Sequence, residues 1–234
     1  MRRLARLTLI FAVAFAVLII APAFLSDSFV LYPLIKDGDV LDLFTPLVLI
    51  PLYWLLFQIH ERCPPSQKET LIFLIFAVFW VQGQGMHLAA NSIGHLTKAY
   101  SGSNIEQLTG FYDETLSHYI WHLGLVGLSA LLIYRQWHHP FTKHRSKLKL
   151  EVIAGVVHGF NYFIDVVESA TGILGVPFAA GVVLFVLVWG RQHIRQQPIL
   201  AFFFVSYGIA CLFFLSWGLY WGGLPEFSRV GIID

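Results

Sequence analysis

The chain has 234 residues, of which 57% are hydrophobic and only 12% are charged, and its formal net charge is +1. A soluble domain carries about 25% charged residues, so this composition excludes an ordinary soluble domain and indicates an integral membrane protein. Because the basic residues are confined to short loops, we expect no nucleic-acid partner. The two cysteines, Cys63 and Cys211, lie too far apart in expected depth to suggest a disulfide.

Seven apolar windows are long enough for helices that cross the hydrocarbon layer, which takes about 20 residues. They cover residues 5–25, 40–59, 70–96, 113–136, 151–170, 173–191 and 198–221. The connections are short, so we predict a single domain over residues 1–234, an all-α, polytopic integral membrane protein built as a seven-transmembrane-helix bundle. The first window is long for the apolar region of a signal peptide, and we expect it to stay as an anchor.

The distribution of Lys and Arg predicts the orientation, because cytoplasmic loops are enriched in both. With the N-terminus in the cytoplasm, the outer segments hold only Lys36, Lys98 and Arg229, and the other twelve basic residues lie inside. We therefore predict a cytoplasmic N-terminus, an outside C-terminus and a multi-pass location in the plasma membrane. Membrane lipids are the expected surroundings, and the sequence does not indicate an oligomeric state.

The third, fourth and fifth windows each carry polar residues at helical spacing. On a helix, each set falls within an arc of about 80°. The sets are Gln84, His87, Asn91 and His95; then Glu114, His118 and His122; then His158, Asn161, Asp165 and Glu168. Asp113 lies about 100° from the second set and is expected at the mouth of the bundle. All three stripes fall in the outer half of the bundle, with His158 deepest, near the midplane.

Ionisable groups inside a membrane cost about 2.5–3.5 kcal/mol each and normally face partners inside the bundle. Imidazole and carboxylate groups are the ligands of zinc, iron, manganese and copper. We therefore predict a shared metal site, with zinc the first choice and iron or copper as alternatives. The predicted ligands are His87, His95, His118, His122 and His158; the predicted catalytic carboxylates are Glu114, Asp165 and Glu168; and Gln84, Asn91, Asp113 and Asn161 are expected to support the ligands.

The first functional hypothesis is a metal-dependent hydrolase that acts on a lipid or another amphiphilic substrate. Three histidines with an open position activate a bound water, and a nearby carboxylate accepts its proton. The arrangement resembles seven-helix membrane hydrolases such as the alkaline ceramidases and the progestin and adipoQ receptors in helix number and in its inward His and carboxylate groups. Their early Ser-to-His motif and late HxxxH motif are absent, since the seventh window has no His. The resemblance therefore assigns no residue role.

Two other classes remain open. The number of candidate ligands also suits a dinuclear iron or copper oxidoreductase, or a haem held between two histidines. A transporter or sensor of protons or metal ions is the third class. It would need polar groups that continue into the inner leaflet, and the inner parts of the third to fifth windows are apolar, as in "LIFLIFAVFW" and "LVGLSALLIY". This asymmetry favours a pocket over a conduit.

Overall fold

The computed structural model describes residues 2–60, 63–97, 100–140, 149–192 and 194–232, and all its regular elements within these ranges are helices. Seven of them are long and apolar enough to cross a membrane. Their candidate spans are Arg3–Phe24, Asp37–Phe57, Gln67–Thr97, Asn104–His138, Lys149–Glu168, Gly172–Gly190 and Pro198–Trp221. Each one overlaps a predicted window, so the prediction of an all-α protein with seven helices of transmembrane length is confirmed.

Several spans are built from more than one helical element. The elements in chain order are α1 (Arg2–Ile20), η1 (Ala21–Phe24), α2 (Asp37–Asp42), α3 (Phe44–Phe57), α4 (Gln67–Thr97), α5 (Asn104–Gly110), η3 (Phe111–Ser117), α6 (His118–His138), α7 (Lys149–Glu168), α8 (Gly172–Phe185), η4 (Val186–Gly190), η5 (Ile194–Gln196) and α9 (Pro198–Trp221). Two of these, η3 and η4, are π-helices, in which the backbone bonds run from residue i to i+5.

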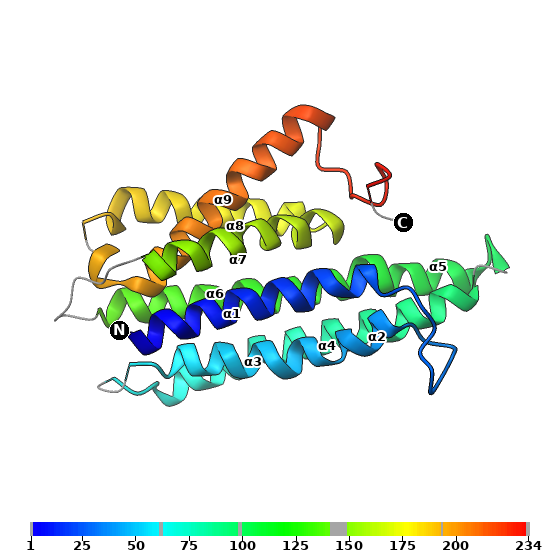
Figure 1. The fold of residues 1–234 in the computed structure, drawn as a ribbon, viewed down its shortest axis with the longest axis horizontal. Coiled ribbons are helices and arrows are strands. Elements are labelled where there is room, and N and C mark those ends of the chain that lie inside the picture. Colours follow the sequence, from blue (N-terminus) through cyan, green and yellow to red (C-terminus); the bar gives the residue numbers. More distant parts are fainter. Residues whose placement is uncertain (1, 61–62, 98–99, 141–148, 193, 233–234) are drawn as a thin grey trace.

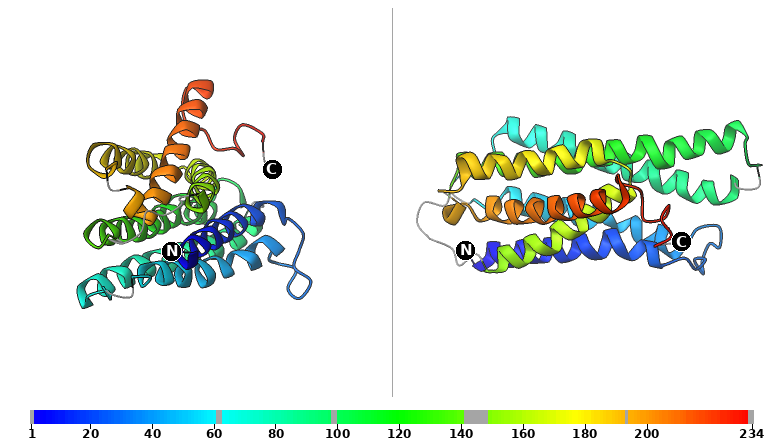
Figure 2. Two further views of the ribbon diagram at one scale, coloured as in Figure 1. Left: turned by 60° about the vertical axis from the view of Figure 1, so that its left-hand side comes forward. Right: turned by 90° about the horizontal axis from the view of Figure 1, so that it is seen from above.

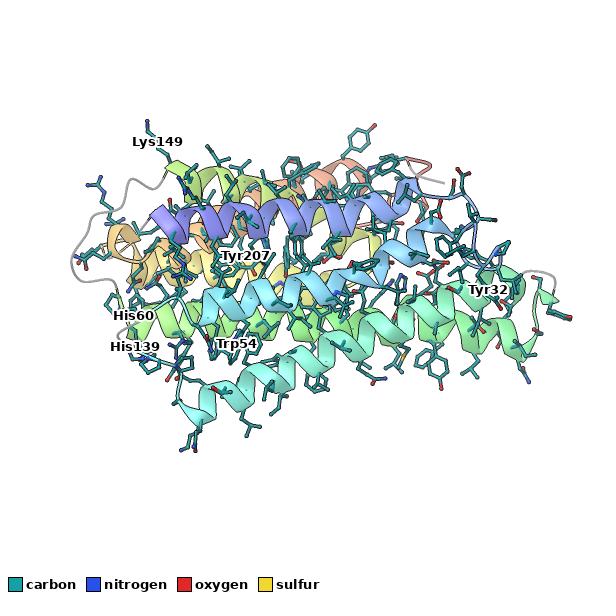
Figure 3. The ribbon with its side chains drawn as sticks, turned by 60° about the horizontal axis from the view of Figure 1, so that its bottom comes forward. Tyr32, Trp54, His60, His139, Lys149 and Tyr207 are labelled. Carbon is teal, nitrogen blue, oxygen red and sulfur yellow. The ribbon has the colours of Figure 1, made fainter. Side chains whose placement is uncertain are left out.

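The helices lie roughly along one direction, with the two chain ends at opposite ends of the bundle (Figure 1). We call the end that holds residues 58–60, 63–66, 139–140 and 191–192 the N-face, and the end that holds residues 25–36, 100–103, 169–171 and 222–232 the C-face. Figure 3 shows His60, His139 and Lys149 at the N-face and Tyr32 at the C-face. The C-face half of α9 leans away from the other helices (Figures 1 and 2).

Close backbone contacts at glycine hold the central helices together. A Cβ on Gly159 of α7 would lie 2.1 Å from the carbonyl oxygen of Ser206 on α9, and a Cβ on Gly83 of α4 would lie 2.4 Å from the backbone nitrogen of Trp121 on α6. Small residues at such contacts let helices approach in lipid, where there is little hydrophobic drive between them. These two contacts fix which faces meet between α7 and α9 and between α4 and α6.

Burial separates central from peripheral helices. In the apolar window of the span Asn104–His138, 72% of residues are buried, and in that of α7 the share is 61%. The corresponding share for Gly172–Gly190 is 22%, which is typical of a helix with most of its surface toward lipid. Two of the three polar stripes therefore lie on the most enclosed helices, and the third lies on α4, whose span Gln67–Thr97 is 28% buried.

Candidate functional site

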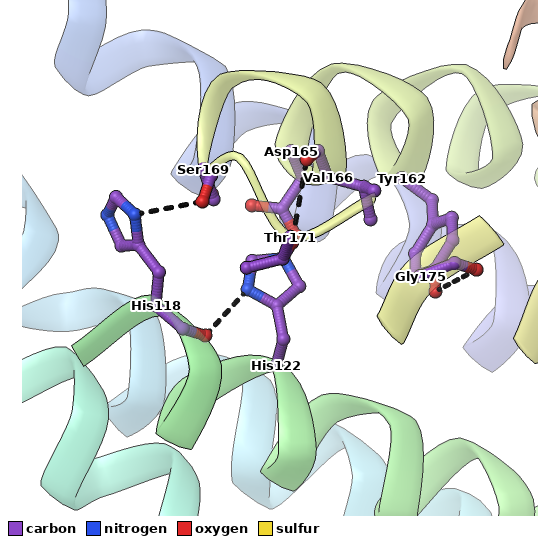
Figure 4. A network of polar contacts seen from close by, with 8 residues as sticks. All are labelled: His118, His122, Tyr162, Asp165, Val166, Ser169, Thr171 and Gly175. Atoms are coloured by element: carbon purple, nitrogen blue, oxygen red, sulfur yellow. Dashed lines mark hydrogen bonds and ion pairs between the residues drawn. The ribbon is translucent and has the colours of Figure 1, made fainter. Parts of the chain in front are cut away.

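A buried pair formed by His122 on α6 and Asp165 on α7 is the centre of the site (Figure 4). His122 Nε2 lies 3.1 Å from Asp165 Oδ2, and the two side chains are 0% and 2% exposed. The other ring nitrogen, His122 Nδ1, lies 2.9 Å from the carbonyl oxygen of His118, one turn earlier on the same helix. Both nitrogens of this imidazole are therefore in contact with oxygen atoms.

These contacts determine where the hydrogens of the pair must be. A carbonyl oxygen only accepts, so Nδ1 of His122 carries a hydrogen and donates it. An ionised carboxylate also only accepts, so a lone pair on Nε2 cannot face Asp165 Oδ2 without a positive charge between them. The pair therefore holds one more proton, as imidazolium with carboxylate or as imidazole with carboxylic acid, or it shares a metal cation.

His118 has one ring nitrogen fixed in the same way. Its Nδ1 lies 3.2 Å from the carbonyl oxygen of Ser169, just beyond the end of α7, and the residue is 5% exposed. Figure 4 shows the imidazoles of His118 and His122 rising from one face of α6 toward this last turn of α7. Since Nδ1 donates to the carbonyl, Nε2 of His118 carries the lone pair and is the atom free to bind a cation or accept a proton.

A second imidazole–carboxylate contact lies on the side of α4. His87 Nδ1 is 2.8 Å from Asp113 Oδ1, although neither atom has an aligned hydrogen bond. The rings of His87 and His118 have centroids 4.9 Å apart. Asp42, at the end of α2, is half-buried and interacts electrostatically with both His87 and Asp165. We call Asp42, His87, Asp113, His118, His122 and Asp165 the polar core.

The π-helix η3 decides which acidic residue enters the polar core. The sequence predicted that Glu114 shares a face with His118 and His122, on the assumption of α-helical spacing. A π-helix has more residues per turn than an α-helix, so the α-helical spacing does not hold here, and Asp113 is buried and meets His87 instead. Glu114 is exposed. The structure thus exchanges the places that the sequence predicted for Asp113 and Glu114.

Two predicted site residues, Glu168 and His158, have contacts away from the polar core. Glu168 Oε2 accepts hydrogen bonds from the backbone nitrogens of Phe227 and Ser228, at 2.7 and 3.4 Å, and so holds the segment after α9. His158 is 0% exposed and is ringed by aromatic side chains of α1, α7 and α9, with Nδ1 2.7 Å from Ser206 Oγ. His95 is half-buried near the C-face end of α4.

The predicted amide residues differ in whether their side chains are already hydrogen-bonded. Asn91 donates to Asp39 at 3.0 Å and so ties α4 to α2, while Asn161 donates to the carbonyl oxygen of Val157 within α7 at 2.6 Å. Gln84 is 2% exposed and neither of its side-chain polar atoms has a hydrogen-bond partner. Both polar atoms of Gln84 and the Oδ1 atom of Asn161 therefore keep hydrogen-bonding capacity for another molecule.

Sequence reasoning missed Asp39, Asp42 and Trp121. Asp39 accepts bonds from Asn91, Ser92 and the backbone of Lys36. The spacing of Asp39 and Asp42, three residues apart at the start of the second window, was the available signal for one inward face. Trp121 is buried and stacks on His122 with centroids 5.1 Å apart.

A metal site is not preformed in the structure. Within residues 2–60, 63–97, 100–140, 149–192 and 194–232, no group of three or more His, Cys, Asp and Glu side chains is arranged so that it could hold a metal ion. The imidazoles and carboxylates instead meet in pairs. The chain has no match among protein-family models, curated proteins or solved structures.

Proposed function

We propose that the protein is a membrane-embedded hydrolase that acts on an amphiphilic substrate at its polar core. The observation that carries the proposal is the buried His122–Asp165 pair, in which a fixed Nδ1 hydrogen forces a positive charge between Nε2 and the carboxylate. Buried pairs of an imidazole and a carboxylate are candidates for catalytic centres. The Lys and Arg distribution favours a position of this centre toward the outer side of the plasma membrane.

In this proposal Asp165 is the general base and His122 positions it. The contact with His122 uses Oδ2 of Asp165, which leaves Oδ1 outside that contact. Oδ1 takes a proton from water while the water oxygen forms a bond to the electrophilic carbon of the substrate. The same proton then passes to the leaving group as its bond to that carbon breaks, so the pair ends in its starting protonation state.

Zinc is the cofactor that the available side chains favour, since zinc is commonly bound by imidazole nitrogen and carboxylate oxygen. His87, Asp113 and His118 do not form a group that could hold a metal ion as they lie in the structure, so they would have to close around zinc to bind it. The lone pair on His118 Nε2 and the His87 ring beside it are the groups that would do so. Bound zinc lowers the pKa of a coordinated water to about 7, which makes a weak base such as Asp165 sufficient.

The test combines metal content with activity. Purified protein in detergent is expected to contain zinc, to show no visible absorption and to hydrolyse a fluorogenic long-chain acyl ester. His118→Ala should lose the zinc, and the control His138→Ala, an exposed histidine on the same helix, should keep it. Asp165→Asn should keep the zinc but lose hydrolysis.

Other outcomes point to the other classes. Iron or copper in the preparation, or a Soret band, would replace the hydrolase with an oxidoreductase. Full hydrolysis without any metal would remove zinc from the proposal and leave the His122–Asp165 pair as the whole centre. Hydrolysis that survives Asp165→Asn would remove the base assigned above.

Proton transfer is a second candidate, favoured by one observation. Asp165 interacts electrostatically with Tyr53 on α3, and the Tyr53 hydroxyl lies 2.9 Å from Ser129 Oγ on α6, with all three groups buried. Polar groups thus extend from the polar core toward the N-face. Proteoliposomes with an internal pH dye test this candidate: proton uptake that Tyr53→Phe abolishes would support it over hydrolysis.

A further inference from the structure

Two buried N–H groups beside the polar core have no partner. The indole nitrogen of Trp121 and both polar atoms of the Gln84 side chain lack hydrogen bonds, and the residues are 7% and 2% exposed. More than nine in ten buried polar groups in proteins are paired, so two unpaired donor groups in one neighbourhood require an explanation.

Both groups are placed at the polar core by the contact between α4 and α6. The Trp121 ring stacks on His122 at 5.1 Å and lies 5.9 and 6.1 Å from the rings of His118 and His87. Gln84 follows Gly83, whose backbone touches that of Trp121, and precedes His87 by one helical turn. Trp121 therefore borders the polar core directly, and Gln84 lies one turn before His87 on the neighbouring helix α4.

We propose that the N–H groups of Trp121 and Gln84 bind the carbonyl oxygen of the acyl group that is cleaved, and stabilise the negative charge that forms on it. The inference rests on the proposed hydrolysis. As water attacks the acyl carbon and its proton moves to Asp165, the carbonyl electron pair moves onto the oxygen; when the electron pair returns, the leaving group departs with that proton. Donors aimed at such an oxyanion are worth about 100- to 1,000-fold each in kcat.

The chain supplies a matched control for Trp121. Trp80 on α4 is also fully buried and its indole nitrogen also lacks a partner, but its ring packs on Tyr53 of α3. If unpaired indoles simply meet buried water, Trp80→Phe and Trp121→Phe should have the same small effect. If Trp121 serves the reaction, only its loss should slow the chemical step.

The experiment compares Trp121→Phe, Trp80→Phe and the shape-preserving Gln84→Met with the unchanged protein. The probes are a fluorogenic long-chain acyl ester and a long-chain trifluoromethyl ketone, whose hydrate resembles the tetrahedral intermediate. We expect Trp121→Phe and Gln84→Met to lower kcat about 100-fold, to change KM less than threefold and to weaken ketone binding by about the same 100-fold. Trp80→Phe should change none of these, and all variants should keep the unfolding temperature within a few degrees.

Equal losses in Trp80→Phe and Trp121→Phe, or an unchanged kcat in Trp121→Phe, would overturn the inference while the hydrolase stands. A fall in kcat without weaker ketone binding would also overturn it. If the unchanged protein neither cleaves the ester nor binds the ketone, the proposed function itself fails and the inference fails with it.

Discussion

The Arg135–Glu69 ion pair at the N-face and the His122–Asp165 pair toward the C-face differ in what surrounds them. At the N-face, Arg135 contacts Glu69 Oε2 at 2.8 Å, donates to the carbonyl oxygen of Cys63 at 2.8 Å and lies over the ring of Phe57. Toward the C-face, His122 and Asp165 are accompanied by neighbours with unpaired polar atoms, such as Gln84 and Trp121. The first pair joins a loop to two helices, whereas the second retains capacity for another molecule.

The comparison teaches that burial of charge alone does not identify a functional site. Arg135 is 5% exposed and His118 is equally buried, yet the guanidinium is used by three different elements around it. A guanidinium with such contacts stabilises a loop at the end of a helix. The number of elements that already contact the charged group, and not the depth of the charge, separates this structural pair from the polar core.

The largest loss of folding stability is expected from Asp165→Ala. Removing one member of a buried pair leaves the other without compensation and costs about 3–5 kcal/mol. Asp165→Asn should cost much less, because an amide hydrogen can bond His122 Nε2 without any added charge. Thermal unfolding in detergent measures both variants, and equal destabilisation would show that the pair needs the charge of Asp165 rather than a hydrogen between the two atoms.

Gly159→Ala should cause the second-largest loss of folding stability. The new Cβ would lie 2.1 Å from Ser206 O, so α7 and α9 must separate, at a cost of about 1–3 kcal/mol. Gly208→Ala on α9 is the control, since nothing lies within 4 Å of its Cβ, and it should raise stability slightly. Unfolding temperatures compare the two, and a harmless Gly159→Ala would mean that this helix contact is looser than described.

Glu69→Gln sharpens the contrast between the two ends. The Glu69 side chain is 15% exposed. Loss of its negative charge should lower the free energy of unfolding by about 1 kcal/mol, because Arg135 keeps its hydrogen bond to the carbonyl oxygen of Cys63. Hydrolysis of the acyl ester should stay unchanged. A loss of activity comparable to that of Asp165→Asn would show that the N-face pair takes part in function, against the division drawn here.

Tyr53→Phe should cause the smallest loss of folding stability, about 1 kcal/mol for one buried hydrogen bond. Ser129→Ala removes the other partner, and the double variant should lose little more than either single one, because both changes break the same contact. Fully additive losses in unfolding free energy would indicate that the two hydroxyls have separate partners.

The spans were predictable because hydropathy and length alone determine them, and the faces were predictable only where the helices are regular. The stripe on α7 placed Asp165 correctly inward, and that on α4 placed Gln84 and His87 on the inward side. The fourth window was misread at Asp113 and Glu114 since nothing in its sequence marked a π-helix. His158 was grouped with the other histidines by spacing, which does not reveal that its neighbours are phenylalanines of α1 and α9.

The length of α4 has an electrical consequence. From Glu69 to His87 the helix rises about 27 Å, nearly the ~30 Å of the hydrocarbon layer, so the polar core lies close to one boundary when Glu69 lies at the other. Most of a transmembrane voltage would then fall across the protein between Glu69 and His87. A cation that reaches His87 from the nearer boundary crosses little of that voltage. The fraction of protein molecules with a cation bound at His87 should therefore be almost independent of membrane potential.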